Sequence, residues 1–202
     1  MALLATDDAN RADGAIGASW SSSGSNPFVI KTNRFSNGAL VNVASQYTAI
    51  TLPADNWAQA TVKLTTNMSW VGVALRYASG VQTYYAGGAN PLDNGGSNNR
   101  RIWKNIAGAR TSLASEAIDI AIDDVLRLEL QGTTLTLFVN GNLRLTAVDS
   151  SIASGGAPAI IGRVSSGTDF VQLDDFSTGD FSGFTKIVGS RFSLAGRGGL
   201  VA

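Results

Sequence analysis

Apolar and polar residues alternate with a period of two along much of the chain. Every second residue is apolar in residues 58–65, large apolar side chains recur in the same way in 71–78, and the pattern returns in 126–131 and 134–139. Such alternation is typical of a β-strand with one buried face and one face in water. No strand–helix–strand rhythm interrupts it, so the pattern predicts an antiparallel all-β fold.

Turn signals between the alternating segments suggest how the strands are connected. Asn140-Gly141, a strong hairpin signal, and Gln131-Gly132 separate three of them. They predict a three-stranded meander over 125–131, 133–139 and 143–148. The other predicted elements are strands near 28–31, 39–43, 47–52, 81–86, 100–107, 110–114, 158–164 and 170–177, a long polar loop over 87–99, and a loop or short 3₁₀ turn over 116–124.

Missing residue types exclude several kinds of chemistry. The chain of 202 residues has no cysteine and no histidine, which removes disulfides, thiol catalysis, Ser-His-Asp systems and most zinc or iron sites. Its 15 basic and 15 acidic residues give a formal net charge of zero, so we expect no nucleic-acid partner. No apolar run approaches the roughly 20 residues that span a bilayer, and we expect no membrane partner.

The N-terminus, Met1-Ala2-Leu3-Leu4-Ala5, lacks the cationic start and the longer apolar run of a secretory signal. We therefore expect synthesis in a cytoplasm, without export by that route.

Residues 8–20 (Asp-Ala-Asn-Arg-Ala-Asp-Gly-Ala-Ile-Gly-Ala-Ser-Trp) resemble the opening of concanavalin-like, laminin-G-like jelly-roll domains, which begin Asp-Phe-Asn-Arg-Ala-Asp-Gly. Ala9 departs from that pattern, so a core aromatic residue is missing. The likeness spans about residues 5–180 and implies a two-sheet antiparallel jelly-roll sandwich with one concave face. Further matches follow in the family's order: Trp57, Tyr84-Tyr85, Trp103-Lys104, Asn140-Gly141, Asp149 and Leu173-Asp174-Asp175-Phe176.

Members of this family serve as sugar-binding modules, as glycosidase catalytic domains and as adhesive parts of phage and bacterial surface proteins, and the fold alone does not choose among these roles. A glycosidase needs two carboxylates on either side of the scissile bond. The chain has only two glutamates, Glu116 and Glu129, and they do not form the Glu-x-Asp-x-x-Glu pattern of laminarinase-type relatives. The adjacent acidic pairs include Asp123-Asp124 and Asp174-Asp175. Neighbouring side chains of a strand point to opposite faces, so the two members of a pair cannot flank one bond. We therefore expect no enzymatic activity.

The same resemblance implies a structural calcium ion that ties the N-terminal strand to the last one. Calcium takes oxygen ligands from carboxylates and carbonyls, and the matching positions are Asp8, with Asp7 beside it, and Asp174 or Asp175. The alternative is that Asp174 and Asp175 cap a turn or pair with Arg11. No cofactor is expected to be required.

A sugar site needs exposed aromatic rings together with polar groups that hold hydroxyls. The best candidates beside the loop over 87–99 are Tyr84, Tyr85 and Trp103, with Arg100 and Arg101. The alternative is that Trp103 and one of the tyrosines belong to the core, and that the arginines form ion pairs or a solvated rim.

The last twenty residues differ from the rest, and we divide the chain into a jelly-roll domain over 1–182 and an extension over 183–202. The extension carries three cations and no acid, with apolar residues spaced along it. It is predicted to be either a frayed terminus or an arm that docks on a partner. The docking residues would be Lys186, Arg191, Phe192, Leu194, Arg197 and Leu200.

Arginine outnumbers lysine eleven to four, a bias that protein interfaces share. Together with the absence of catalytic groups, this favours a non-enzymatic structural protein of a bacteriophage particle. Capsid decoration or a head- or tail-associated adhesin fits, with other virion proteins, further copies of the same chain and a host-surface glycan as partners. The alternative is a free carbohydrate-binding module, and a glycoside hydrolase comes third.

Overall fold

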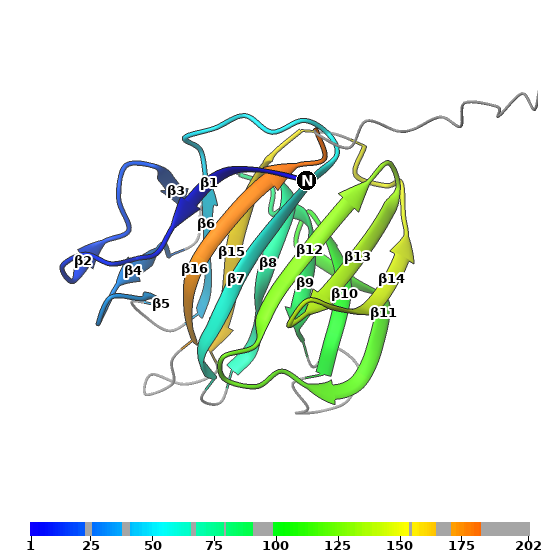
Figure 1. Cartoon of the computed structure of the whole chain (residues 1–202). Coiled ribbons are helices and arrows are strands. Elements are labelled where there is room, and N and C mark those ends of the chain that lie inside the picture. Colours follow the sequence, from blue (N-terminus) through cyan, green and yellow to red (C-terminus); the bar gives the residue numbers. More distant parts are fainter. Residues whose placement is uncertain are drawn as a thin grey trace, which may run out of the picture.

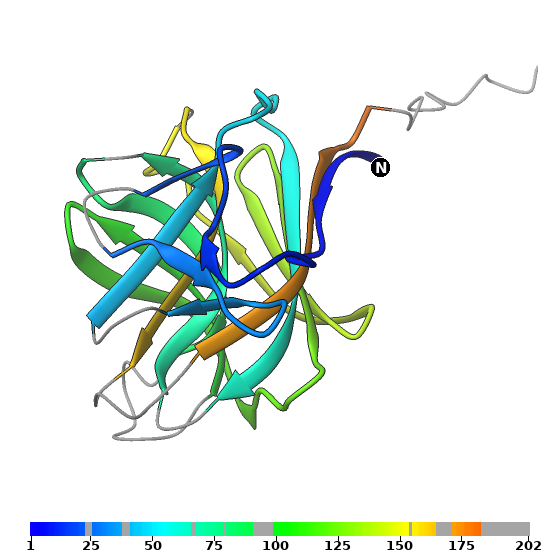
Figure 2. The same cartoon turned by 90° about the vertical axis from the view of Figure 1, so that its left-hand side faces the viewer.

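The computed structural model describes residues 1–22, 26–37, 41–65, 68–78, 80–90, 99–153, 155–164 and 171–182. These residues form two antiparallel β-sheets that pack face to face (Figures 1 and 2). None of them belongs to a helix, and hence none to a helix able to cross a membrane. The predicted antiparallel two-sheet sandwich is confirmed, whereas the predicted arm over 183–202 lies outside the described residues.

Sheet A lies in front in Figure 1 and has nine strands in the described part. The short strand β1 (Ala2–Asp7) runs along one edge of the last strand, β16 (Val171–Asp180). The order of the others is β14 (Asn142–Val148), β13 (Thr134–Val139), β12 (Val125–Gln131), β7 (Asn56–Thr65), β16, β5 (Phe35–Asn37), β4 (Phe28–Ile30) and β2 (Gly14–Ala15).

Sheet B lies behind sheet A and has seven strands in the described part (Figure 1). Their order is β11 (Ala109–Asp119), β10 (Asn99–Ile106), β9 (Thr83–Ala89), β8 (Met68–Ala78), β15 (Ala157–Val164), β6 (Val41–Tyr47) and β3 (Trp20–Ser22). We call the face of sheet B that packs on sheet A its inner face and the opposite face its outer face.

The meander β12–β13–β14 agrees with the sequence prediction to within one residue. Asn140 and Gly141 both have positive φ, 53° and 75°, as the predicted two-residue hairpin turn requires.

Three element predictions are wrong. Strands were expected at 39–43 and 47–52, but one strand, β6, covers residues 41–47, and residues 48–52 belong to no strand. β11 continues to Asp119 where a loop was predicted, because β10 begins at Asn99 and pairs with that extension. Of the predicted loop over 87–99, residues 87–89 belong to β9 and Asn99 begins β10, whereas residues 91–98 lie outside the described residues.

Alternating apolar side chains from both sheets fill the space between them. Leu128 and Leu137 of sheet A are fully buried and lie over Gly87 of β9, where an added Cβ would be 2.9 Å from Leu137 Cδ1. Glycine at this position thus makes room for the two leucines. The close fit is typical of a protein interior.

An aromatic cluster closes the sandwich at the end where β3 meets sheet A. The ring of Trp20 lies 5.3 Å from Phe35, 5.0 Å from Tyr47 and 4.8 Å from Phe176, measured between centroids. These tilted and edge-on contacts add stabilisation beyond the buried area. Ala9, the position where related domains have Phe, is completely buried in the same core.

Asp149, just after β14, ties sheet B to the end of the meander. Its carboxylate accepts hydrogen bonds from Tyr85 Oη at 2.7 Å, Lys104 Nζ at 2.6 Å and the Ser151 amide at 2.9 Å. Burial opposes its charge, but the bonds from Lys104, Ser151 and Tyr85 hold the pKa of Asp149 well below the ordinary carboxyl value. A charged Asp149 therefore stabilises the folded state.

Replacing Asp149 with Asn should lower the free energy of unfolding at pH 7 by about 1–2 kcal/mol, because the charge-assisted bond to Lys104 is weakened. The folded state depresses this pKa below its unfolded value of about 3.9. The stabilisation is therefore present above about pH 4 and is lost as the pH falls toward the folded pKa. Urea unfolding should be measured for wild type and D149N at several pH values from 7 to about 2. The difference between their free energies of unfolding should become smaller as the pH falls. A difference that stays constant would contradict this account, and D119N, at an exposed carboxylate of β11, is the control.

Candidate functional site

The residues predicted to form a sugar site lie on two different faces of sheet B. Side chains of β9 and β10 alternate between the faces. Tyr85 and Arg100 therefore point to the inner side, whereas Tyr84, Arg101 and Trp103 belong to the outer face.

Burial decides between the two interpretations of these residues. Tyr85 and Trp103 have no exposed surface, so neither is an exposed stacking ring, and Tyr84 keeps 5% of its surface exposed. Tyr85 is a core residue whose hydroxyl accepts a hydrogen bond from the Ile152 amide at 3.0 Å. The core interpretation holds for Tyr85. Trp103 and Tyr84 are buried in a different place, on the outer face.

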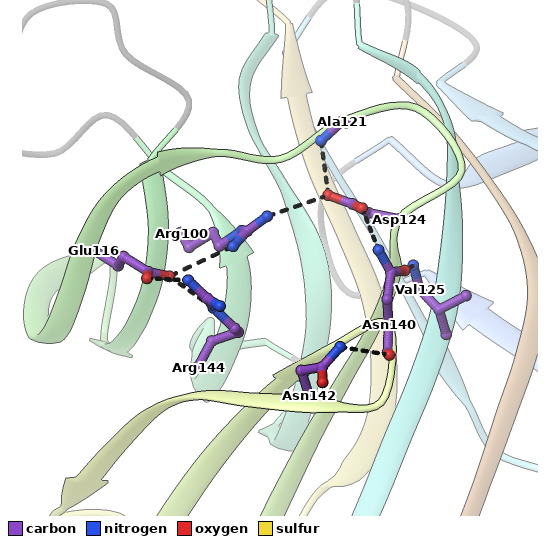
Figure 3. A network of polar contacts seen from close by, with 8 residues as sticks. All are labelled: Arg100, Glu116, Ala121, Asp124, Val125, Asn140, Asn142 and Arg144. Carbon is purple, nitrogen blue, oxygen red and sulfur yellow. Dashed lines mark hydrogen bonds and ion pairs between the residues drawn. The ribbon is translucent and has the colours of Figure 1, made fainter.

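Arg100 belongs to a network of ion pairs that joins the two sheets (Figure 3). Its guanidinium lies 3.5 Å from Glu116 and 3.8 Å from Asp124. Glu116 also pairs with Arg144 of β14, and Asp124 accepts a hydrogen bond from Asn140 Nδ2 at 2.7 Å. Arg100 is therefore engaged in holding β10 and β11 against the meander, as the ion-pair alternative described.

The outer face of sheet B carries a second cluster of buried apolar residues, separate from the main core. The cluster combines four aromatic rings, which come from β8, β9 and β10, with alanines on β6, β8, β9 and β15. We call this set the outer cluster; its members are Ala44, Trp70, Ala74, Tyr77, Tyr84, Ala86, Trp103, Ala159 and Ile161.

Tyr77 reaches the outer cluster through an irregularity in β8. The alternation in the sequence predicts that Tyr77 shares a face with Val73 and Leu75. Arg76, however, has a φ of 53°, and the pairing of β8 with β9 shifts register between Leu75 and Ala78. This bulge turns Tyr77 to the outer face, where its ring stacks on that of Tyr84 at 5.0 Å and 6°. Burial and the neighbouring Tyr77 raise the pKa of the Tyr84 phenol to about 12.

Two arginines lie against the ring of Trp70. The guanidinium carbon of Arg110 is 3.8 Å from the ring centroid and that of Arg163 is 5.1 Å away. Both distances are within the range of a cation–π contact. Burial and the nearby positive charge of Arg163 lower the pKa of Arg110, although any arginine remains charged at neutral pH.

A pocket of about 70 Å³ opens among these groups. This is smaller than the sites that enclose a whole small molecule, about 300–1,000 Å³, so the pocket can receive only one part of a ligand. Rings and polar groups both line it: Trp70, Tyr77 and Tyr84 on one hand, Asn42, Asn105, Gln82 and Arg110 on the other. No acidic residue lines it in the described part of the chain.

Two amide oxygens in the pocket have no hydrogen-bond partner among the described residues. They are Oδ1 of Asn42 and Oδ1 of Asn105, and Asn105 is only 2% exposed. Buried acceptors are normally satisfied. The residues that line the pocket thus carry two unsatisfied acceptors as well as the guanidinium donors of Arg110.

The sequence interpretation missed Trp70, Tyr77, Asn105, Arg110 and Arg163. Asn105 and Arg110 could have been found, because both share the face of Trp103 once β10 and β11 are paired as a hairpin. Tyr77 could not, because its face depends on the bulge at Arg76.

The four aspartates proposed for calcium are arranged differently from a metal cage. β1 does pair with β16, with Asp7 opposite Phe176. Both oxygens of Asp7, however, accept hydrogen bonds from Arg11, at 2.7 and 3.0 Å, and Trp20 Nε1 donates to Asp7 at 2.7 Å. A guanidinium in this position repels a divalent cation.

The other carboxylates of that set do not complete a cage. Asp8 is exposed and accepts from the Asn10 amide, while Asp175 accepts from Thr61 Oγ1 at 3.3 Å. Asp174 accepts from the Asp175 amide at 3.0 Å, at an irregularity within β16 rather than at a turn. No group of three acidic side chains is close enough to hold a metal within the described residues. These residues do not fit calcium.

Solved structures share this fold at low sequence identity. Carbohydrate-binding module CBM66 from Bacillus subtilis has a TM-score of 0.56 at 11% identity, covering 81% of this chain and 92% of that chain. A β-1,3-1,4-glucanase (lichenase) from a mouse hindgut metagenome has a TM-score of 0.58 at 10% identity, with coverage of 87% and 97%.

The CBM2 module of the evolved Dit of Lactobacillus casei BL23 phage J-1 has a TM-score of 0.58 at 11% identity, covering 87% of this chain and 94% of that chain. No protein-family model and no curated protein sequence matches the chain. The likenesses show a concanavalin-like jelly-roll fold.

Calcium or a chelator should leave the melting temperature unchanged, because Arg11 already neutralises Asp7. A thermal melt with added calcium, with magnesium at equal ionic strength and with chelator is the measurement. A rise in Tm with calcium that magnesium does not reproduce would show that the cage forms after all.

Proposed function

We propose that the chain is a non-enzymatic glycan-binding module whose site is the pocket on the outer face of sheet B. The observation that carries this proposal is the combination of aromatic walls with buried, unpartnered amide oxygens in one pocket. A sugar presents C–H faces to rings and hydroxyls to polar groups, so it meets both needs at once. The fold shared with a carbohydrate-binding module supports the proposal.

The absence of enzymatic activity is part of the proposal. Glycoside hydrolysis needs two carboxyl groups about 5–9.5 Å apart across the bond, and no carboxylate lines the pocket within the described residues. Glu116 is paired with Arg144, and Glu129 with Arg127.

Use of the module on a bacteriophage particle is a second candidate, favoured by the fold that it shares with the phage J-1 module over most of both chains. In this role the domain would display a host-binding site, and residues 183–202 would dock on other virion proteins or on further copies of the chain.

Replacing Trp70 with Ala should weaken glycan binding by at least about tenfold, which corresponds to roughly 1.4 kcal/mol, because the ring forms a wall of the pocket. Trp57→Ala is the matched control: Trp57 is 7% exposed and Trp70 6%, but Trp57 lies in sheet A. Glycan-array screening followed by titration calorimetry on the strongest glycan gives the comparison. Asn105→Ala, a smaller change in the same pocket, should also weaken binding. Equal binding by all of these proteins would place the site elsewhere.

Deleting residues 183–202, the proposed docking arm, should reduce the oligomer to a monomer, because the arm is proposed to bind further copies of the chain. Glycan affinity should stay unchanged, because the glycan is proposed to bind in the pocket and not to the arm. Size-exclusion chromatography with light scattering on both lengths measures this, since closed oligomers are normally symmetric with a definite mass. The same subunit number for both lengths would remove the docking role of the arm.

A further inference from the structure

We propose that the pocket on the outer face of sheet B takes an acidic sugar, one that carries a carboxylate, sulfate or phosphate group. Arg110, which lines the pocket, and Arg163, which lies outside it against the ring of Trp70, would bind that group. This inference rests on the proposed function and names the class of glycan. Three features carry it: two arginines without a carboxylate, the ring that orients them, and buried acceptors that need donors.

Arg110 and Arg163 have no carboxylate partner in the described part of the chain, whereas Arg11, Arg100, Arg127 and Arg144 each form an ion pair there. Arg34 and Arg76 form no ion pair in that part either, but they donate hydrogen bonds to Gln172 Oε1 and to the Ile152 carbonyl.

The two guanidiniums share one ring. At 3.8 and 5.1 Å from the centroid of Trp70, they bring two like charges to the same small area, which disfavours both. The lowered pKa of Arg110 has burial and the charge of Arg163 among its causes. A bound anion would offset this repulsion, and a partly buried guanidinium binds an anion more strongly than a solvated one does.

Trp70 also prepares the arginines for binding. A guanidinium stacked on an aromatic ring keeps its N–H groups directed outward in one plane, where they match the oxygens of a carboxylate, sulfate or phosphate. Little side-chain entropy is then lost when the anion binds.

The buried acceptors indicate that the ligand is more than a simple anion. Oδ1 of Asn105 and Oδ1 of Asn42 lack a donor among the described residues, and they line the same pocket as Arg110. Sugar hydroxyls can donate to these oxygens, whereas a bare anion cannot. An acidic sugar supplies both the anion and the donors.

An array of glycans with uronate, sialate, sulfate and phosphate groups, printed beside neutral glycans of the same backbones, tests the proposal on the full-length protein. Binding should be confined to the acidic glycans and should weaken with added salt. Arg110→Gln and Arg163→Gln should each reduce affinity for the strongest glycan by about tenfold to a hundredfold. Arg34→Gln is the matched control, since it removes the same charge from a residue whose hydrogen-bond partner is Gln172 of sheet A.

The outcomes separate the two proposals. If neutral glycans bind equally well and salt has no effect, the acidic-sugar inference fails and the glycan-binding function stands. If the folded protein binds no glycan, both fail. Preferential binding of an RNA oligonucleotide, which also combines phosphate with hydroxyls, would overturn the acidic-sugar inference too. Arg163 is exposed, so its variant should fold normally and keep the test valid if Arg110→Gln does not.

Discussion

The central strands of sheet B are buried on both faces, and the rest of the molecule is arranged around that constraint. On the inner face, sheet A covers them with leucines such as Leu128 and Leu137. On the outer face, the described residues provide no third layer. Trp70, Tyr84 and Trp103 bury one another there, around the alanines between them. The pocket lies beside these rings, with Trp70, Tyr77 and Tyr84 in its wall.

Charge follows from the same arrangement. The outer rings need polar cover that tolerates partial burial, and the flat guanidinium of Arg110 on Trp70 provides it. This cover brings positive charge to the pocket wall without a carboxylate beside it in the described part. Arg110 therefore covers the apolar ring of Trp70 and, in the binding proposed above, would also contact the anion.

The carboxylates are used elsewhere, in holding the ends of the sandwich. Asp7 joins β1 to Trp20, Asp149 joins sheet B to the meander, and Glu116 and Asp124 hold β10 and β11 in place. Each carboxylate faces a cation or a hydrogen-bond donor in its folded position. None of these four carboxylates lines the pocket.

The sequence alone determined the fold class, the meander and its hairpin turn, because alternation and turn preferences act between neighbours along the chain. It also excluded thiol and histidine chemistry, since those residues are absent. The outer face of sheet B, the face proposed to bind glycan, was decided only by the tertiary structure. Trp70 and Arg110 meet through strands far apart in sequence, and the bulge at Arg76 moves Tyr77 to a face that alternation does not predict. Strand order and register arise from packing between distant segments, which no local pattern records.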